Sequence, residues 1–162
     1  MSDSDLLKAL LDEERRLVFP YFDHATAWDL GGAMREAAHA AQYPVAILIR
    51  RSGQRLFHTA LSGSSPDNDA WLERKSAVVD RFGHSSYYIG CKARAESDVD
   101  FNVASRLDPE RFAAHGGAFP LLVAKSGCIG TIAVSGLPQR EDHRFVVEQI
   151  QLFLDHFDGR TS

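Results

Sequence analysis

The chain has 162 residues, of which 44% are hydrophobic and 25% charged, and its formal net charge is −4 at pH 7. This length predicts one domain, residues 1–162 with a core at about 10–155, large enough to fold without disulfides or metals. The charge argues against nucleic-acid binding, because the basic pairs are scattered and interleaved with acids. No apolar run approaches the length of a membrane span, and the acidic amino terminus does not resemble a signal peptide. With Cys91 and Cys128 in no zinc or haem-attachment motif, we expect a cytoplasmic protein without a motif-type metal site, a membrane partner or a nucleic-acid partner.

The first part of the chain predicts two helices followed by a hairpin. Leucines at helical spacing mark an amphipathic first helix, and Asp23 is a good N-cap for a second helix that runs to about Gln42. Residues 45–51 are a β-branched run and residues 54–62 alternate, which predicts a hairpin with a short glycine turn. The apolar face of the second helix is unusually small, which favours close packing on a sheet or another helix: Ala27, Leu30, Gly31, Met34, Ala37, Ala38 and Ala41.

Two more helices are expected in the middle of the chain. Ser65 and Pro66 are typical of a helix start and Gly83 of a helix end. A shorter helix is expected from Ser85 or Ser86 to about Ala93. Residues 95–108 are expected to be a loop, with a helical turn beginning after Asp108-Pro109.

A second hairpin and a final helix complete the chain. The β-rich runs FPLLVAK and CIGTIAV are joined by Ser126-Gly127, and Leu137-Pro138 opens a helix with a wide apolar face. This order predicts an α+β fold, an antiparallel sheet built from two hairpins with helices packed on it in two layers.

The ends of the second hairpin form the first candidate site. His115, Gly116 and Gly117 precede it, and Arg140 and His143 lie in the first turn of the last helix. Adjacent glycines let a ligand or another backbone approach closely, and a helix start presents free N–H groups. The alternative is structural: the glycines form a turn and a bulge, and the segment before the helix only caps it.

Lys75 and the histidines are further candidates. Lys75 shares a helical seam with Trp71, so it either extends its charge past the core edge or reaches a partner in a pocket. His58 could point from its strand into a cleft, and if His58, His115 and His143 converged they could hold a cofactor or an acidic substrate. No nucleophile–base set is legible, so catalysis is not expected.

Residues 114–150, AHGGAFPLLVAKSGCIGTIAVSGLPQREDHRFVVEQI, resemble the GlcG/HbpS-like family of haem-degrading or haem-binding proteins. Residues 50–75 follow the pattern RRxGQxLFHxALxGSxPDNxxWxxRK, and together with LDPxRxAAHGGxFPL and VSGLPQREDH this resembles an uncharacterised subgroup. The resemblance covers about residues 10–155. The matching positions of the family pattern are Gly116-Gly117, Pro120-Leu121, Gly127, Ile129-Gly130, Val134-Ser135-Gly136 and Asp142.

The resemblance implies a profilin-like α/β module that assembles into homo-oligomers, with haem or corrinoid association in some branches. It assigns no haem ligand to a residue of this sequence. Aromatic content favours the same assembly, because a two-layer domain leaves an apolar face open, so we expect a homo-oligomer larger than a dimer.

Two hypotheses of function remain. The first is a small module that binds haem or another anionic small molecule, since cationic and imidazole groups form charge-assisted hydrogen bonds with carboxylates. Its expected ligand residues are His58, Lys75, His115, Gly116, Gly117, Arg140 and His143. The second is a non-catalytic homo-oligomeric adaptor that binds other proteins through the aromatic side chains of Trp28, Trp71, Tyr87 and Tyr88.

Overall fold

The computed structural model describes residues 1–160, and its centre is a four-stranded antiparallel sheet in the order β2-β1-β4-β3. Each hairpin supplies two neighbouring strands, and β1 pairs with β4 to join them, with Ile47 opposite Val134. The expected α+β fold built from two hairpins is confirmed. The strands are β1 (Ala46–Arg51), β2 (Gln54–Ala60), β3 (Ala118–Val123) and β4 (Gly127–Ser135).

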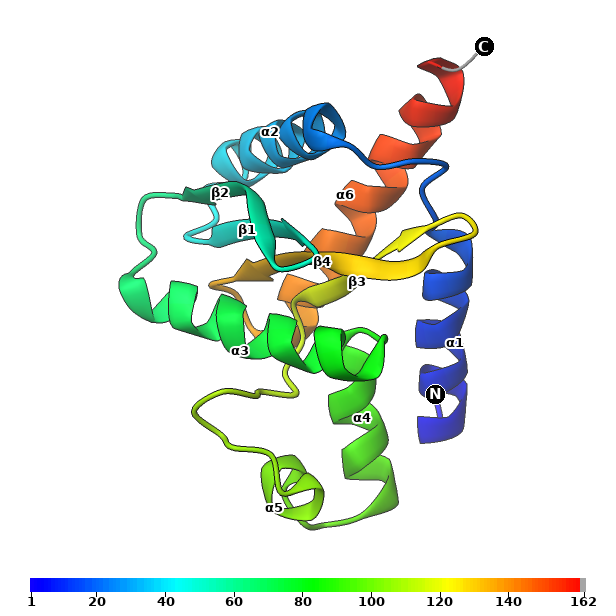
Figure 1. The fold of residues 1–162 in the computed structure, drawn as a ribbon. Helices are drawn as coiled ribbons and strands as arrows, with labels where there is room; N and C mark the ends of the chain where they lie inside the picture. The colour runs from blue at the N-terminus through cyan, green and yellow to red at the C-terminus, as the bar shows by residue number, and fades with distance from the viewer. Residues whose placement is uncertain (161–162) are drawn as a thin grey trace.

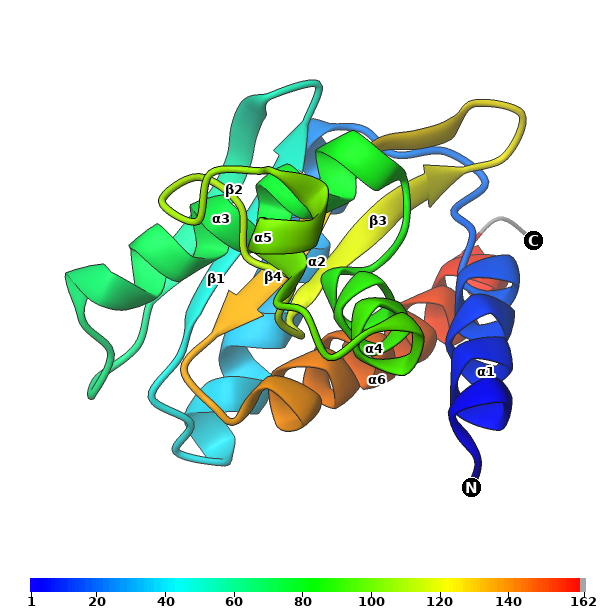
Figure 2. The same ribbon diagram turned by 90° about the horizontal axis from the view of Figure 1, so that it is seen from below.

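Helices cover both faces of the sheet (Figure 1). One face carries α2 (His24–Ala40) and α6 (Gln139–Arg160), and the other carries α3 (Pro66–Phe82) and α4 (Ser86–Glu96). The expectation of two layers is therefore wrong, because the helices between the hairpins pack on the face opposite to α2 and α6. The remaining helices are α1 (Asp3–Arg16), which lies beside α4, and the short α5 (Phe101–Ser105), which lies near α4. Figure 2 shows α1 standing at the edge of the molecule, next to α4 and α6.

The two faces of the sheet pack with side chains of different size. Large side chains of α2 and α6, among them Leu30, Met34 and Ile150, meet the sheet in the main core. Burying each of these stabilises the fold by roughly 1.5–3 kcal/mol. The cluster under α3 is small and half of it is alanine: Ala46, Leu48, Leu72, Val79, Ala118 and Ala133. Alanines at this interface leave little apolar bulk between α3 and the sheet.

Local sequence signals fix the helix ends and the close packing of α2. The Asp23 carboxylate accepts a hydrogen bond from the Thr26 amide at 2.8 Å, which caps α2. Gly31 lies against the ring of Phe57, and a Cβ at this position would be 2.3 Å from Phe57 Cγ. The small apolar face of α2 is thus a requirement of its contact with β2. At the end of α3, Gly83 adopts the left-handed conformation with a φ of 71°.

The segment after α4 departs from the expected loop. Helix α4 continues to Glu96, and α5 follows, capped by the Asp100 side chain, which accepts from the Asn102 amide at 2.9 Å. The turn expected after Asp108 is present, with a hydrogen bond from the Arg111 amide to the Asp108 carbonyl at 3.0 Å. A five-residue helix shows too little periodicity to be recognised in a sequence.

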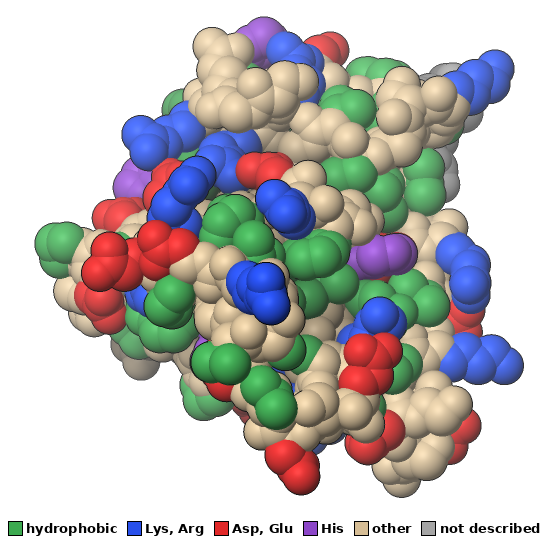
Figure 3. Space-filling model, turned by 60° about the horizontal axis from the view of Figure 1, so that its bottom comes forward, with side chains coloured by type: hydrophobic (Ala, Val, Ile, Leu, Met, Phe, Trp, Pro, Cys, Tyr) green, Lys and Arg blue, Asp and Glu red, His purple; other side chains and the backbone are tan. Residues whose placement is uncertain are grey.

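Basic and acidic side chains alternate on the surface. Figure 3 shows them interspersed around hydrophobic side chains, without a continuous stripe of one charge. Within residues 1–160, no helix combines the length and hydrophobicity needed to cross a membrane. Cys91 is buried in α4 and Cys128 is exposed at the start of β4, and both are free thiols.

Candidate functional site

The first turn of α6 lies between two hollows of the surface. The first, which we name the α3 hollow, has a volume of 220 Å³ and lies between α3, the Gly116 backbone and the start of α6. The second, the α1 hollow, has a volume of 470 Å³ and lies between α1, α6 and Tyr87 of α4. The candidate residues divide between these two spaces and two others.

Lys75 forms the floor of the α3 hollow and is only 2% exposed. Its Nζ donates to the Gly116 carbonyl at 3.0 Å, the Val134 carbonyl at 2.7 Å and Asp142 Oδ2 at 3.3 Å. A lysine ammonium has three protons, so all of its hydrogen bonds are made within the protein. The interpretation of Lys75 as a side chain that extends past the core edge is wrong, because α3 directs it under the start of α6.

Asp142 connects this lysine to the start of α6. Its Oδ1 accepts from the Leu137 amide at 3.0 Å, and its Oδ2 accepts from the Gly136 amide at 3.3 Å. Burial raises the pKa of Asp142 and lowers the pKa of Lys75, and the attraction between their charges opposes both shifts. The pair holds α3, α6 and the backbone at Gly116 together.

The adjacent glycines are required by the same contacts. Gly117 has a φ of 135°, and a Cβ there would lie 2.3 Å from both Lys75 Nζ and the Val134 carbonyl. At Gly116 a Cβ would lie 2.2 Å from the Gln139 carbonyl. Both glycines therefore let the backbone approach Lys75 and α6, which is the structural alternative considered for them.

His115 is the exposed member of the group. Its ring packs on Trp71, with 5.1 Å between ring centroids, and the Arg74 guanidinium lies 4.1 Å from the Trp71 ring centre. Partial burial lowers the pKa of His115, and the nearby charges of Arg94, Lys75 and Arg74 lower it further, whereas Asp100 opposes them. The ring is therefore neutral at pH 7.

His115 also borders a third hollow of 460 Å³, the α5 hollow, between α4 and α5. This space is lined by side chains that include Arg94, Phe101 and Asn102. Among residues 1–160, His115 has no hydrogen-bond partner, so its ring nitrogens are available at the junction of two hollows.

The three histidines considered together do not converge. His58 bonds to Asp69 at 2.6 Å in a separate hollow of 540 Å³ between β2 and α3. His143 bonds to Glu13 of α1 at 2.8 Å and lines the α1 hollow, as does Arg140. Over the described part of the chain, no group of three or more His, Cys, Asp or Glu side chains is arranged to hold a metal ion.

Of the expected ligand residues, the structure brings together Lys75, His115, Gly116 and Gly117. Sequence reasoning missed Gln139, whose Oε1 accepts from the Gly116 amide at 2.9 Å, and the polar side chains of Asn68 and Ser135. Asn68, Trp71 and Lys75 all line the α3 hollow from α3, and their i, i+3 and i+7 spacing was a signal in the sequence. The signal for Gln139 lay only in its place at the start of α6.

Comparisons with known proteins agree on one family. The family model described as haem degrading protein HbpS-like matches residues 22–151. A UPF0303 protein of Streptomyces avermitilis is 54% identical over 142 residues, which cover 88% of this chain and 86% of that protein. A UPF0303 protein of Serratia proteamaculans is 44% identical over 154 residues, 95% of each chain.

Solved structures show the same fold. The Ybr137w protein superposes with a TM-score of 0.85 at 36% identity, covering 93% of this chain and 88% of that one. The PduOC:haem complex superposes with a TM-score of 0.65 at 18% identity, over 83% of this chain and 94% of that chain, and at this identity the likeness concerns the fold alone. The family model and the close relatives together establish that the chain belongs to the HbpS-like family of haem-degrading proteins.

Proposed function

We propose that this protein is a single-domain, non-catalytic ligand-binding module that holds a carboxylate-bearing ligand at His115. The observation that carries the proposal is the position of this imidazole, which is free of hydrogen bonds to residues 1–160 and stands between the α3 and α5 hollows. Arg94 lines the α5 hollow together with Asp98 and Asp100, and the Arg74 guanidinium lies over Trp71, which lines the α3 hollow. A carboxylate bound at His115 therefore has a guanidinium available on each side.

The charges around His115 support this class of ligand. Arg74, Lys75 and Arg94 all lie close enough to depress its pKa, and Asp100 is the acidic group that opposes them. Lys75 contributes only its charge, because its three protons are already bonded. Arg74 and Arg94 are the groups that would donate to a carboxylate, since a guanidinium binds carboxylates through two parallel hydrogen bonds.

Haem is one source of such carboxylates, through its propionates, and a small organic acid is the other. The α3 hollow, at 220 Å³, is smaller than the roughly 300–1,000 Å³ of sites for larger ligands. The α5 hollow, at 460 Å³, falls within that range and offers Phe101 beside His115 and Arg94. On the α5 side His115 would hold the iron and Arg94 a propionate, while Asp98 and Asp100, which also line this hollow, would leave room for only one propionate there.

When bound, haem would supply an iron atom, which an imidazole nitrogen of His115 would hold. The family membership and the PduOC:haem complex with the same fold support testing haem first. The neutral state of His115 suits this role, because only an unprotonated ring nitrogen can bind a metal.

Titration with haemin and, separately, with citrate tests the proposal and distinguishes the two sources. We expect a saturable Soret shift with one site per chain, lost in His115→Ala and kept in His39→Ala, a matched exposed histidine on α2. Calorimetric titration with citrate tests binding of a small organic acid, and we expect Arg74→Gln to bind citrate more weakly than the wild type. Absence of saturable binding by both compounds, or equal binding in His115→Ala, would contradict the proposal.

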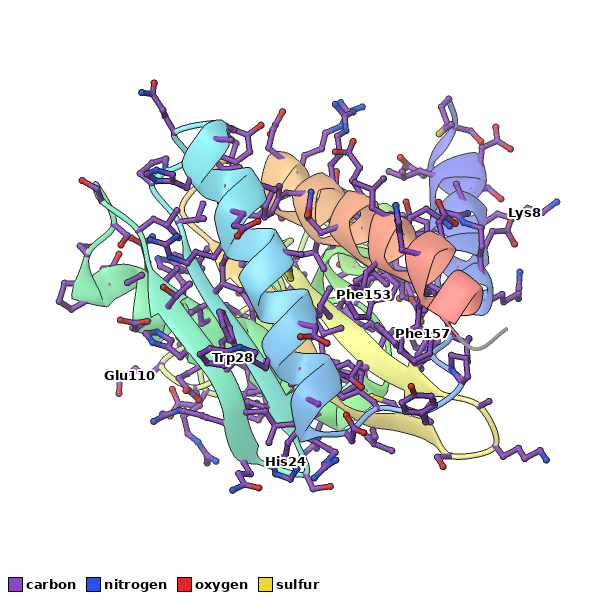
Figure 4. All side chains as sticks on the ribbon, turned by 90° about the horizontal axis from the view of Figure 1, so that it is seen from above. Lys8, His24, Trp28, Glu110, Phe153 and Phe157 are labelled. Carbon is purple, nitrogen blue, oxygen red and sulfur yellow. The ribbon has the colours of Figure 1, made fainter. Side chains whose placement is uncertain are left out.

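A second candidate function, a homo-oligomeric adaptor that also binds other proteins, rests on Trp28. This side chain is 69% exposed on α2, where it meets the edge of Phe57 on β2 at 5.9 Å (Figure 4). Exposed tryptophans are typical of interaction surfaces, and β2 is an outer strand of the sheet. Trp71, Tyr87 and Tyr88, by contrast, pack against His115, His143 and His84.

Light scattering coupled to size exclusion tests this candidate. We expect a mass above twice 17.9 kDa for the wild type, consistent with an assembly larger than a dimer, and a lower mass for Trp28→Ala. A wild-type mass near that of one chain at micromolar concentration would contradict it.

We also propose a cytoplasmic location. Cys91 is buried and Cys128 is exposed, and neither forms a disulfide in the described part of the chain. Alkylation under denaturing, non-reducing conditions should add two labels, and an oxidised, unlabelled protein would contradict the proposal.

A further inference from the structure

We propose that the α1 hollow is a second binding site, separate from His115, for a small monoanion with an apolar body, such as a medium-chain carboxylate. This goes beyond the proposed function, because it assigns a different ligand to a different surface. It also gives Arg140 and His143 a role of their own, apart from the residues of the α3 hollow.

The shape of the α1 hollow suits a small molecule. Its volume of 470 Å³ lies within the roughly 300–1,000 Å³ typical of ligand sites. Helices α1 and α6 form two walls and Tyr87 of α4 contributes the third. Figure 2 shows α1 at the edge of the molecule, with α4 and α6 beside it.

A buried imidazole with an unused nitrogen lies in this wall. His143 is 4% exposed, its Nε2 is 2.8 Å from Glu13 Oε1, and its ring packs on Tyr87 with 4.9 Å between ring centroids. Its Nδ1 is buried and has no hydrogen-bond partner in the part of the chain that the structure describes. Buried polar atoms nearly always have a partner, so we expect an atom of a ligand or of a water molecule to bind here.

Two arginines stand at the mouth of the hollow. Arg140 and Arg144 are four residues apart on α6 and therefore neighbours on one helix face, and both are exposed. Neither forms an ion pair with a residue of the described chain. An unpaired arginine pair of this spacing can hold a carboxylate between its guanidinium groups.

The rest of the lining restricts the ligand further. Leu6 and Leu10 of α1 provide apolar lining across from the arginines of α6, and Val147 adds apolar surface on α6 itself. Three acidic residues, Asp3, Glu13 and Glu148, also line the hollow, and their negative charges disfavour a ligand with more than one negative charge. A single carboxylate attached to an apolar chain suits the arginines and the leucines of this lining, because its head meets the guanidinium groups while its body covers Leu6 and Leu10.

Calorimetric titration with sodium octanoate, and with octanamide as the uncharged match, tests the proposal. We expect one saturable site for octanoate, at least tenfold weaker in Arg140→Gln/Arg144→Gln, and weak or absent binding of octanamide. The matched control Arg106→Gln/Arg111→Gln changes two exposed arginines elsewhere and should bind as the wild type does.

A second readout follows the imidazole itself. With ¹⁵N-labelled histidine, the Nδ1 resonance of His143 should shift on octanoate addition in the wild type and not in the Arg140/Arg144 double variant. His115→Ala should leave octanoate binding unchanged, which separates this site from the one proposed at His115.

Three outcomes would overturn the proposal. One is the absence of saturable octanoate binding, which would leave an ordered water as the only partner of Nδ1. Another is undiminished binding in the Arg140/Arg144 double variant. The third is loss of binding in His115→Ala, which would place octanoate in the neighbouring hollows.

Discussion

The two sides of the first turn of α6 differ in how completely their polar groups are bonded. On the α3 side, Lys75 and Asp142 are buried and every proton of the ammonium has an acceptor. On the α1 side, His143 is buried with one nitrogen unpaired, and Arg140 is exposed without an ion pair in the described residues. Removing one partner of a buried, fully bonded ion pair destabilises a fold strongly, whereas a buried polar group left without a partner marks a place where a ligand or water can bind.

The strongest test of this comparison is to remove Lys75, the buried cation on the α3 side. Lys75→Met should lower the free energy of unfolding by about 3–5 kcal/mol, because it leaves the Asp142 carboxylate buried without a counter-charge. Urea denaturation measures the change, with the exposed Lys92→Met as the matched control. A Lys75→Met protein as stable as the wild type would show that the pair is not structural and would return Lys75 to the list of ligand residues.

The glycine beside this lysine should be nearly as sensitive. Gly117→Ala places a Cβ against Lys75 Nζ in a left-handed conformation, which costs about 1–3 kcal/mol from the backbone alone. Gly32→Ala is the control: no described atom lies within 4 Å of the added Cβ, and alanine in a helix interior stabilises by roughly 0.5–1 kcal/mol. The midpoint of thermal unfolding should therefore fall for Gly117→Ala and rise for Gly32→Ala. A shift in the same direction for both variants would contradict the packing described for Gly117.

A smaller effect is expected in the way that the protonation of His115 makes the free energy of unfolding depend on pH. Its pKa is lowered in the folded protein, so as the pH falls through 6.5 the unfolded chain binds the proton first and stability falls. The free energy of unfolding stops falling once the ring of His115 is protonated in the folded protein as well. His115→Ala should remove this part of the pH dependence, and His39→Ala should not remove the same part.

The same titration distinguishes the ligands proposed at His115. The affinity for citrate relative to that of His115→Ala at the same pH, a ratio in which the protonation of citrate cancels, should increase on acidification, because a protonated imidazole adds a positive charge. Binding of haemin should weaken, because protonation removes the ring nitrogen that would hold iron. Affinities of the wild type that equal those of His115→Ala for both compounds would show that His115 contacts neither.

The smallest effect on stability is expected for a substitution on the α1 side. Arg140→Gln should change the free energy of unfolding by less than about 0.5 kcal/mol, because no ion pair is lost with it. Urea denaturation of Arg140→Gln and Lys75→Met under the same conditions compares the two losses of stability directly. A loss above 1 kcal/mol would assign Arg140 a structural role and weaken the comparison.

Local signals were enough to predict most elements of the fold. Asp23 caps α2 and Gly83 ends α3 as expected, because capping and left-handed turns depend on neighbouring residues only. The two hairpins were also legible, since alternation and a short glycine turn lie within one stretch of sequence. Helix α5 was missed because its cap at Asp100 was the only strong local signal.

The sequence by itself determined the elements other than α5, the two hairpins and, through long phrases such as VSGLPQREDH, the family. Only the tertiary structure decided that helices cover both faces and that the candidate residues divide among separate hollows. Lys75 meets Asp142 across 67 residues and His143 meets Glu13 across 130. Such contacts depend on which faces of the helices pack against the sheet, and that is set by the whole core rather than by spacing along the chain. For this reason the sequence could name Lys75 and His143 as candidates, while the fold alone showed that one is fully bonded and the other is not.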